Sequence, residues 1–465
     1  MKMQPSPERS HMPEPARTLR DAFNAVDPAL PLPPDDPRYV DCTDVRGDEN
    51  AILHLYHAIT WANRHTHQLF TGHRGCGKST ELLRLEARLE QAGFAVLYFA
   101  ADVDLDAQDL RYSDLLLAIA RRVESEMRER DMPLDADLLK NIERWFAESL
   151  YTEDEWRNVQ RELGTQVSLG VPAILSPFAQ LAAYLTGQIR TGREIKNSIR
   201  QKLDPRIAQL IDNVNLLLAD AALKVRRRGQ TDLVLLIDNL DRIALTDLGG
   251  GRTSHDSLYI EHGEQLTALD CHIVYTVPIS MFYGPKATIL RSIFPENHVL
   301  PMIKTHEPRA RGGNDSAAGL ARLRQILAGR LDLDRLFEPD AVEPLCRACG
   351  GHPRDLMVLA HHAIEYATER PDQPITLEAV RRAEGRLVAA YSRTVLDAHF
   401  PKLARVHLTN QIVNDPDHQQ MLYNLSVLEY ANGLEPWHDA HPAVQLLARF
   451  KQALADERPK LLNAD

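Results

Sequence analysis

One glycine-rich segment carries the residue types that chemistry on phosphates requires. It spans residues 72–79, reads GHRGCGKS, and matches the pattern G-x-x-x-x-G-K-[ST]. Gly72, Gly75 and Gly77 let the backbone curl so that several N–H groups converge on one anion. The Lys78 ammonium can neutralise the β- and γ-phosphates of a nucleotide, and the Ser79 hydroxyl can ligate Mg²⁺. The pattern therefore predicts binding of a nucleoside triphosphate with Mg²⁺.

The residues on either side of this segment predict the elements that position it. Residues 68–71 (Gln-Leu-Phe-Thr) are a plausible strand, and residues 80–89 have the apolar spacing of an amphipathic helix. The N-terminus of that helix adds a partial positive charge facing the phosphates. We expect the nucleotide contacts to come from Gly72, Gly75, Cys76, Gly77, Lys78, Ser79 and Thr80.

A second buried strand supplies a carboxylate. Residues 233–237 are five consecutive apolar residues, and Asp238 follows them directly. A continuous apolar run suits a central parallel strand that is covered on both faces. Ligands lie at the carboxyl ends of such strands. Asp238 is therefore predicted to hold Mg²⁺ through water, next to Ser79.

The chain is long enough for more than one domain. At 465 residues, two or three compact units are expected. We predict an α/β fold, with a parallel-sheet P-loop NTPase core, a helical lid and a C-terminal winged-helix-like segment. The predicted boundaries are a disordered, proline-rich lead-in at 1–37, a core at 38–310 with a helical, partly apolar insertion at about 112–228, a lid at 311–398 and a winged-helix-like module at 399–465.

Charge and cysteine content limit the partners and the compartment. Acidic residues outnumber basic ones by 65 to 54, and the net charge is −11. This balance does not favour capture of DNA, although a local basic patch stays compatible with it. Five scattered cysteines fit a reducing cytoplasm. Cys346 and Cys349 have metal-ligand spacing without a second pair, so we interpret them as buried thiols.

An uncharged stretch, residues 163–189, is long enough to span a bilayer. Its two prolines, three glycines and several polar residues dilute it to borderline hydrophobicity. We favour a buried hairpin or an oligomer contact over contact with a membrane.

Three motifs together resemble a family. These are residues 72–79, residues 236–242 (Leu-Ile-Asp-Asn-Leu-Asp-Arg) and residues 350–354 (Gly-Gly-His-Pro-Arg). They resemble bacterial STAND-type ATPases, and the second motif is also similar to that of the KAP ATPases, both related to AAA+ proteins. By itself, the third motif is typical of the end of one helix and the start of the next. The resemblance implies that Pro353 contacts the base and that Arg354 reaches the β/γ-phosphates.

The resemblance also suggests catalytic residues, with one departure. Many AAA+ relatives place an acid directly after the Mg²⁺-linked aspartate, whereas this chain has Asn239, and an amide cannot accept a proton as a general base. Asp241 is the nearby candidate for the base, or it is structural and paired with Arg242. Thr276 is expected to position the attacking water, and Arg291 to reach the γ-phosphate of a neighbouring subunit.

These expectations combine into a slow, ATP-dependent switch. ATP and Mg²⁺ would alter the angle between core and lid, and thereby an assembly state or a partner contact. We expect a homo-oligomer acting on a separate effector protein in bacterial signalling or antiviral defence. The alternatives are an AAA+ ATPase that acts on DNA through a C-terminal winged helix, and a KAP-like membrane-associated scaffold that uses residues 163–189.

Overall fold

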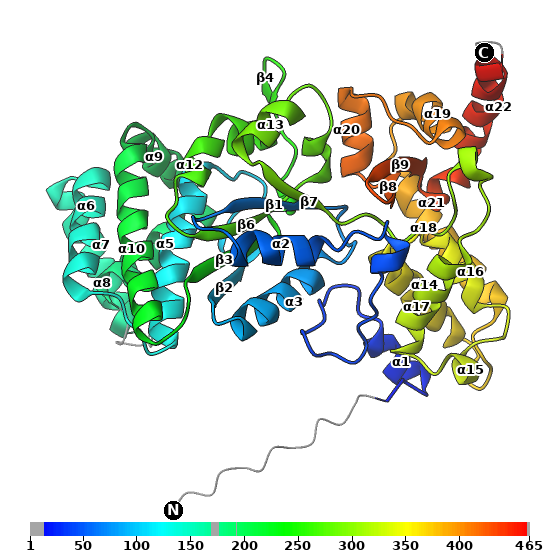
Figure 1. Ribbon diagram of the computed structural model, residues 1–465, viewed down its shortest axis with the longest axis horizontal. Coiled ribbons are helices and arrows are strands. Elements are labelled where there is room, and N and C mark those ends of the chain that lie inside the picture. Colours follow the sequence, from blue (N-terminus) through cyan, green and yellow to red (C-terminus); the bar gives the residue numbers. More distant parts are fainter. Residues whose placement is uncertain (1–13, 169–175, 192, 463–465) are drawn as a thin grey trace, which may run out of the picture. The chain divides into compact units, whose positions relative to one another are not determined.

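The computed structural model (Figure 1) describes residues 14–168, 176–191 and 193–462. These residues form two compact units. The first unit contains the described residues up to 50, residues 72–80 and the described residues from 300 onward. The second contains residues 51–71 and the described residues between 81 and 299.

The second unit is built on a five-stranded parallel sheet with the order β2-β3-β6-β1-β7. Its strands are β1 (His67–Thr71), β2 (Ala95–Ala100), β3 (Leu233–Asp238), β6 (His272–Val277) and β7 (Glu296–Val299). All six residues of β3 and of β6 are buried, because neighbouring layers cover both faces of a parallel sheet. The predicted α/β class with a parallel-sheet core is confirmed.

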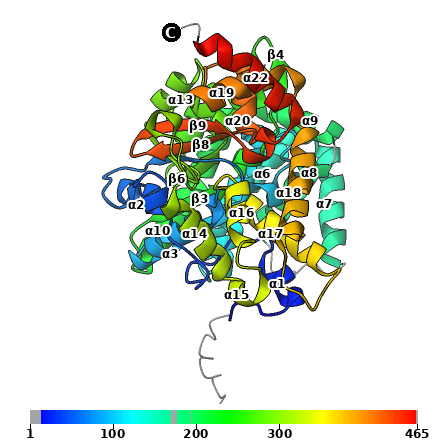
Figure 2. The same ribbon diagram turned by 90° about the vertical axis from the view of Figure 1, so that its right-hand side faces the viewer.

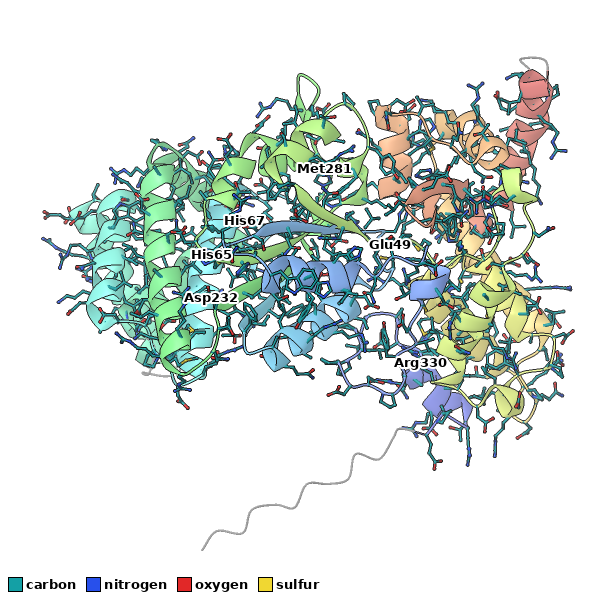
Figure 3. The ribbon with its side chains drawn as sticks, in the orientation of Figure 1. Glu49, His65, His67, Asp232, Met281 and Arg330 are labelled. Carbon is teal, nitrogen blue, oxygen red and sulfur yellow. The ribbon has the colours of Figure 1, made fainter. Side chains whose placement is uncertain are left out.

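The strands share one direction. Figure 3 labels His67, the first residue of β1, and Asp232, the residue before β3, on the same side of the sheet. At the opposite edge, Thr71 pairs with Val277 and Ala100 pairs with Asp238. Gly72 follows Thr71 directly, so the glycine-rich loop starts at the sheet edge that carries Asp238.

Helices complete the second unit. Those outside the insertion are α2 (Ala51–Thr60), α3 (Lys78–Gln91, whose first turn belongs to the first unit), α4 (Ala101–Asp104), α11 (Ser254–Asp256), α12 (Gly263–Thr267) and α13 (Ala287–Ile293). A small hairpin consists of β4 (Asp247–Gly249) and β5 (Arg252–Thr253).

The predicted insertion forms a group of helices on one side of the sheet (Figure 1). They are α5 (Tyr112–Glu129), α6 (Ala136–Leu150), α7 (Glu153–Ser168), α8 (Pro177–Thr191), α9 (Arg193–Leu203) and α10 (Ile207–Arg227). One apolar core joins Leu115 of α5 and Leu217 of α10 to Ile237 of β3. A buried guanidinium reinforces it, because Arg200 donates to the carboxylates of Asp109 and Asp114.

The uncharged stretch at 163–189 divides between two helices. Its first residues end α7, its last residues lie in α8, and residues 169–175 lie outside the described part of the chain. Phe178, Leu181 and Leu185 of α8 are buried in the core of the insertion. Among the residues that the structure describes, no helix is both long and apolar enough to cross a membrane.

The first unit contains the predicted lid. Its helices are α14 (Ala317–Ala328), α15 (Leu333–Leu336), α16 (Val342–Ala348), α17 (Pro353–Ala367) and α18 (Leu377–Ser392). A short helix from the predicted lead-in, α1 (Leu19–Ala25), packs on α17 with Ala22 fully buried. The part of the lead-in around α1 is therefore folded.

The last elements of the first unit form what we call the C-terminal module, residues 400–462. It comprises α19 (Phe400–Thr409), α20 (Pro416–Tyr423), β8 (Val427–Asn432), β9 (Glu435–Ala440), α21 (Pro442–Gln445) and α22 (Ala448–Leu462). Figure 2 shows them in orange and red. The antiparallel β8–β9 hairpin lies where the sequence predicts a wing, and Tyr430 stacks on Trp437 with ring centroids 4.4 Å apart.

Candidate functional site

The glycine-rich loop has a backbone that only glycine supports. Gly72, Gly75 and Gly77 have φ values of +153°, +83° and +112°. A Cβ on Gly72 would lie 2.6 Å from the Leu300 carbonyl oxygen, and one on Gly75 would lie 2.7 Å from His352 Nε2. Because α3 begins at Lys78, the loop leads directly into a helix N-terminus. This geometry fits a phosphate cradle.

The lysine of the loop is buried and engaged with the loop itself. Lys78 is 5% exposed, and its Nζ donates to the carbonyl oxygens of Gly72 at 2.8 Å and His73 at 2.9 Å. Cys76 is fully buried, and Ser79 and Thr80 are half-buried. Thr80 Oγ1 accepts from the Leu32 backbone N–H at 3.2 Å. The nucleotide contacts predicted at residues 72–80 thus lie on one continuous stretch of backbone, the loop and the first turn of α3.

Arg46 is a further cation at the loop, and it lies outside the glycine-rich motif. Its guanidinium is 8% exposed and donates to the carbonyl oxygens of Cys76, at 2.7 Å, and of Pro301. No motif surrounds Arg46, so the sequence carries no signal for this role. Arg46 and Lys78 together place two positive charges at the loop, and these charges favour binding of a polyanion.

The first turn of α17 lies against the loop. The Gly75 carbonyl oxygen accepts from the Arg354 backbone N–H at 3.3 Å, and His352 Nε2 lies 2.6 Å from the Arg74 carbonyl oxygen. Gly351, at φ +76°, lets the turn before α17 pack closely on Ile303, because a Cβ there would lie 1.7 Å from the Ile303 carbonyl oxygen. The structure therefore brings the motif at 350–354 to the loop at 72–79. That Pro353 contacts the base and Arg354 the phosphates remains a prediction.

The C-terminal module also contacts the loop. His73 is 1% exposed, and its Nε2 accepts from the Glu429 backbone N–H of β8 at 2.9 Å. Burial holds the pKa of His73 well below its usual value, so the ring is a neutral acceptor. The Arg74 guanidinium lies over the Tyr423 ring, 4.2 Å from its centroid, and hydrogen-bonds the Tyr423 hydroxyl. Two consecutive loop residues are thus held by α20 and β8.

In the second unit, Asp238 is buried at the end of β3 and tightly held. Its side chain accepts from the Tyr98 hydroxyl of β2 at 2.7 Å and from the Asn239 backbone N–H at 2.7 Å. Burial and the nearby Asp238 raise the pKa of Tyr98 far above its usual value, so the phenol stays protonated and donates. In the sequence, the sign of Tyr98 is weak, because it is a single hydroxyl within the apolar run 95–100.

We expect Tyr98→Phe to lower the affinity for Mg²⁺ in nucleotide binding about 10-fold. Loss of a partner that orients a metal ligand commonly has an effect of this size. The reason is that Asp238 loses the donor that fixes its rotamer. Calorimetric titration of nucleotide at graded Mg²⁺ concentrations measures the effect. Tyr112→Phe is the matched control, because Tyr112 donates to Asp204 at 3.0 Å in the same unit. Equal Mg²⁺ curves for the two variants would contradict the role of Tyr98.

Asn239 has an unusual backbone and an acidic partner. Its φ is +64°, a region that asparagine tolerates better than most residues. Its Nδ2 donates to Asp102 Oδ1 at 2.8 Å, and Arg242 Nη1 donates to Asp102 Oδ2 at 2.6 Å. Asp102, in α4 directly after β2, was not singled out from the sequence, because no motif marks it.

The other predicted catalytic residues lie in different settings. Thr276 is fully buried, and its hydroxyl accepts from the Leu240 backbone N–H at 3.0 Å and lies 3.3 Å from the Ile237 carbonyl oxygen, so it fixes the turn after β3. Asp241 is 5% exposed, and its charge contributes to the raised pKa of the buried Tyr259, whose main cause is burial. Arg291 lies exposed on α13. The catalytic roles of all three remain predictions.

The cysteine pair does not form a metal centre in the part of the chain that the structure describes. Cys346 and Cys349 are buried thiols whose pKa values burial raises. In the described part of the chain, no group of three or more His, Cys, Asp or Glu side chains is arranged to hold a metal ion. Asp238 and Ser79, the predicted magnesium pair, are oxygen ligands of the kind that Mg²⁺ prefers, typically together with water.

No family model matches the chain, and no curated protein matches its sequence. Among solved structures it is similar to ORC from Drosophila bound to DNA, with 11% identity, coverage of 98% of this chain and 95% of that chain, and a TM-score of 0.40. The ORC1 protein of Aeropyrum pernix in complex with DNA has 14% identity, coverage of 97% and 98%, and a TM-score of 0.37. Cdc6p from Pyrobaculum aerophilum has 11% identity, coverage of 93% of this chain and 98% of that chain, and a TM-score of 0.38. Values this low say nothing about chemistry, which rests on this chain's own residues.

Proposed function

We propose that this chain is an ATP-dependent molecular switch of the AAA+-related class that the sequence motifs resemble. It binds ATP with Mg²⁺, hydrolyses ATP slowly and thereby controls its own assembly or a separate effector protein. The observation that carries the proposal is the set of contacts around the loop at 72–79. His352 from the lid and Glu429 from the C-terminal module both bond to the same short loop.

Lys78 connects nucleotide binding to these contacts. A lysine has three N–H donors, and two carbonyl oxygens of the loop already accept from Lys78. Turning the ammonium toward phosphates releases the carbonyls of Gly72 and His73. The ring of that same His73 accepts from Glu429, so a shift of the loop reaches β8 directly. A switch needs such a link between a ligand and a movable element.

Slow hydrolysis follows from the turn after β3. Asn239 has no carboxylate, and its amide is engaged with Asp102. The strained φ of Asn239 also disfavours a glutamate at this position, so the turn is not built for the acid that many AAA+ relatives carry there. Slow turnover leaves the ATP-bound form populated long enough to act on a partner.

The test compares hydrogen exchange and particle mass with and without a non-hydrolysable ATP analogue. We expect the backbone amide of Glu429 to change its exchange rate when the analogue binds, and light scattering to report a larger particle. The same measurements on Arg354→Ala should show weaker coupling. A chain that binds the analogue, stays monomeric and keeps its exchange pattern in β8 would refute the switch mechanism.

ATP-dependent action on DNA is the second candidate. The arrangement of α19, α20 and the β8–β9 hairpin favours it, because winged helices have this order of elements. The charges oppose it: Lys402 is paired with Asp415 and Asp417, and Arg405 is paired with Glu457. DNA binding that weakens steeply with log[salt] would support this candidate over a protein effector.

A further inference from the structure

An acid and an amide face each other at the carboxyl edge of β2 and β3. Ala100 pairs with Asp238, so Asp102 and Asn239, which follow these residues, lie at the same edge of the sheet. The Asn239 amide donates to the Asp102 carboxylate at 2.8 Å. We propose that Asp102 is the carboxylate that activates the attacking water, a proposal that rests on the chain being an ATPase.

Exposure separates Asp102 from the two other acids of this edge. The Asp102 side chain is 26% exposed, so water reaches it. Asp238 is 1% exposed and its side chain accepts from both Tyr98 and Asn239, while Asp241 is 5% exposed and next to the buried Tyr259. Of these three carboxylates, Asp102 alone combines solvent access with a place beside the predicted magnesium ligand.

The partners of Asp102 aim the carboxylate and leave it able to accept a proton. Asn239 donates to Oδ1 and Arg242 donates to Oδ2. Each carboxylate oxygen has a second lone pair, so both donors can stay in place while water approaches. Asn239 is therefore not an acid itself but positions one. Asparagine tolerates the backbone at φ +64°, and its amide supplies the donor to Asp102.

The step balances as an ordinary hydrolysis. The water oxygen forms a bond to the γ-phosphorus while the bond from that phosphorus to the bridging oxygen breaks. The bridging oxygen leaves with ADP and keeps the electron pair of the broken bond. Asp102 takes the proton that the water loses and returns it to solvent, so the products are ADP and inorganic phosphate.

Exchanging the two side chains tests the proposal. Asp102→Asn should lower the single-turnover rate of ATP hydrolysis about 100-fold, the usual scale for loss of a general base. Its affinity for ATP by calorimetry should stay within about 2-fold of wild type. The double variant Asp102→Asn/Asn239→Asp keeps one acid and one amide in contact, and aspartate tolerates the positive φ. We expect it to recover at least about 10-fold of the lost rate.

Asp232→Asn is the control for a purely structural role, because it also removes a carboxylate that pairs with an arginine in the same unit, Arg226 at 2.8 Å. It should retain hydrolysis within about 5-fold of wild type. The proposal is overturned if Asp102→Asn hydrolyses ATP normally, or if Asp232→Asn loses as much rate as Asp102→Asn. It is also overturned if wild-type complexes keep ATP intact for hours, although ATP binding would then stand. Absence of ATP binding by the wild type would refute the proposed function itself, and this inference with it.

Discussion

Lys78→Ala is expected to weaken ATP binding by about 100-fold or more, which corresponds to about 2.8 kcal/mol. The ammonium is the one side-chain cation inside the loop whose place in the motif aims it at the β/γ-phosphates. Its removal also leaves the carbonyls of Gly72 and His73 without this donor. Calorimetry with ATP and Mg²⁺ measures the loss.

Lys304→Ala is the matched control for Lys78→Ala. Lys304 belongs to the same unit, is partly buried and donates from Nζ to Asn432 Oδ1 at 2.9 Å. We expect it to bind ATP with nearly wild-type affinity while losing a comparable hydrogen bond. Wild-type ATP affinity in Lys78→Ala, or an equal loss of ATP affinity in both variants, would contradict the assignment of the loop at 72–79 as the nucleotide site.

Asp355→Ala is expected to destabilise the first unit by about 3–5 kcal/mol, the usual cost of breaking a buried charged pair. Asp355 lies in the first turn of α17, where His352 Nδ1 is 3.0 Å from Oδ1, and His441 Nε2 is 3.1 Å from Oδ2. Tyr391 donates to the same carboxylate at 3.3 Å. Because His352 also contacts the Arg74 carbonyl, the variant should loosen the loop as well. Urea denaturation measures the change in unfolding free energy.

The effect of Asp355→Ala should depend on pH in a defined direction. Burial alone would raise the pKa of Asp355, but the interactions with His352 and His441 outweigh it, so the pKa lies far below its usual range. A carboxyl with a lowered pKa stabilises the fold above its unfolded pKa of about 3.9 and loses that contribution as the pH falls through the folded value. The difference between wild type and variant should therefore be full at neutral pH and shrink below about pH 4.

Asp397→Ala provides the control for Asp355→Ala. Asp397 pairs with Arg449 at the surface, with 72% and 67% of the two side chains exposed. Such pairs contribute about 0–1 kcal/mol because solvent screens them. A loss of stability in Asp397→Ala as large as that in Asp355→Ala, or a pH-independent effect of Asp355→Ala, would contradict the buried network.

Local patterns in the sequence determined the elements. The apolar run at 233–237 predicts a buried strand, and β3 occupies it with all six residues buried. The glycine pattern at 72–79 predicts a turn before a helix, and α3 begins at Lys78. The helical insertion predicted from about residue 112 begins with α5, at Tyr112–Glu129. These features follow from contacts between neighbours in the chain, because periodicity and glycine placement act within a few residues.

Tertiary structure decided which side chains meet. Asp102 and Asn239 are 137 residues apart in the sequence, Arg74 and His352 are 278 apart, and His73 and Glu429 are 356 apart. Such contacts depend on strand order, register and rotamer, which no local pattern encodes. The sequence therefore determined a phosphate loop, a carboxylate-ended strand and a missing acid at position 239. The fold decided that Asp102 stands beside that position and that the lid and the C-terminal module hold the loop, because packing alone brings distant side chains within hydrogen-bond distance.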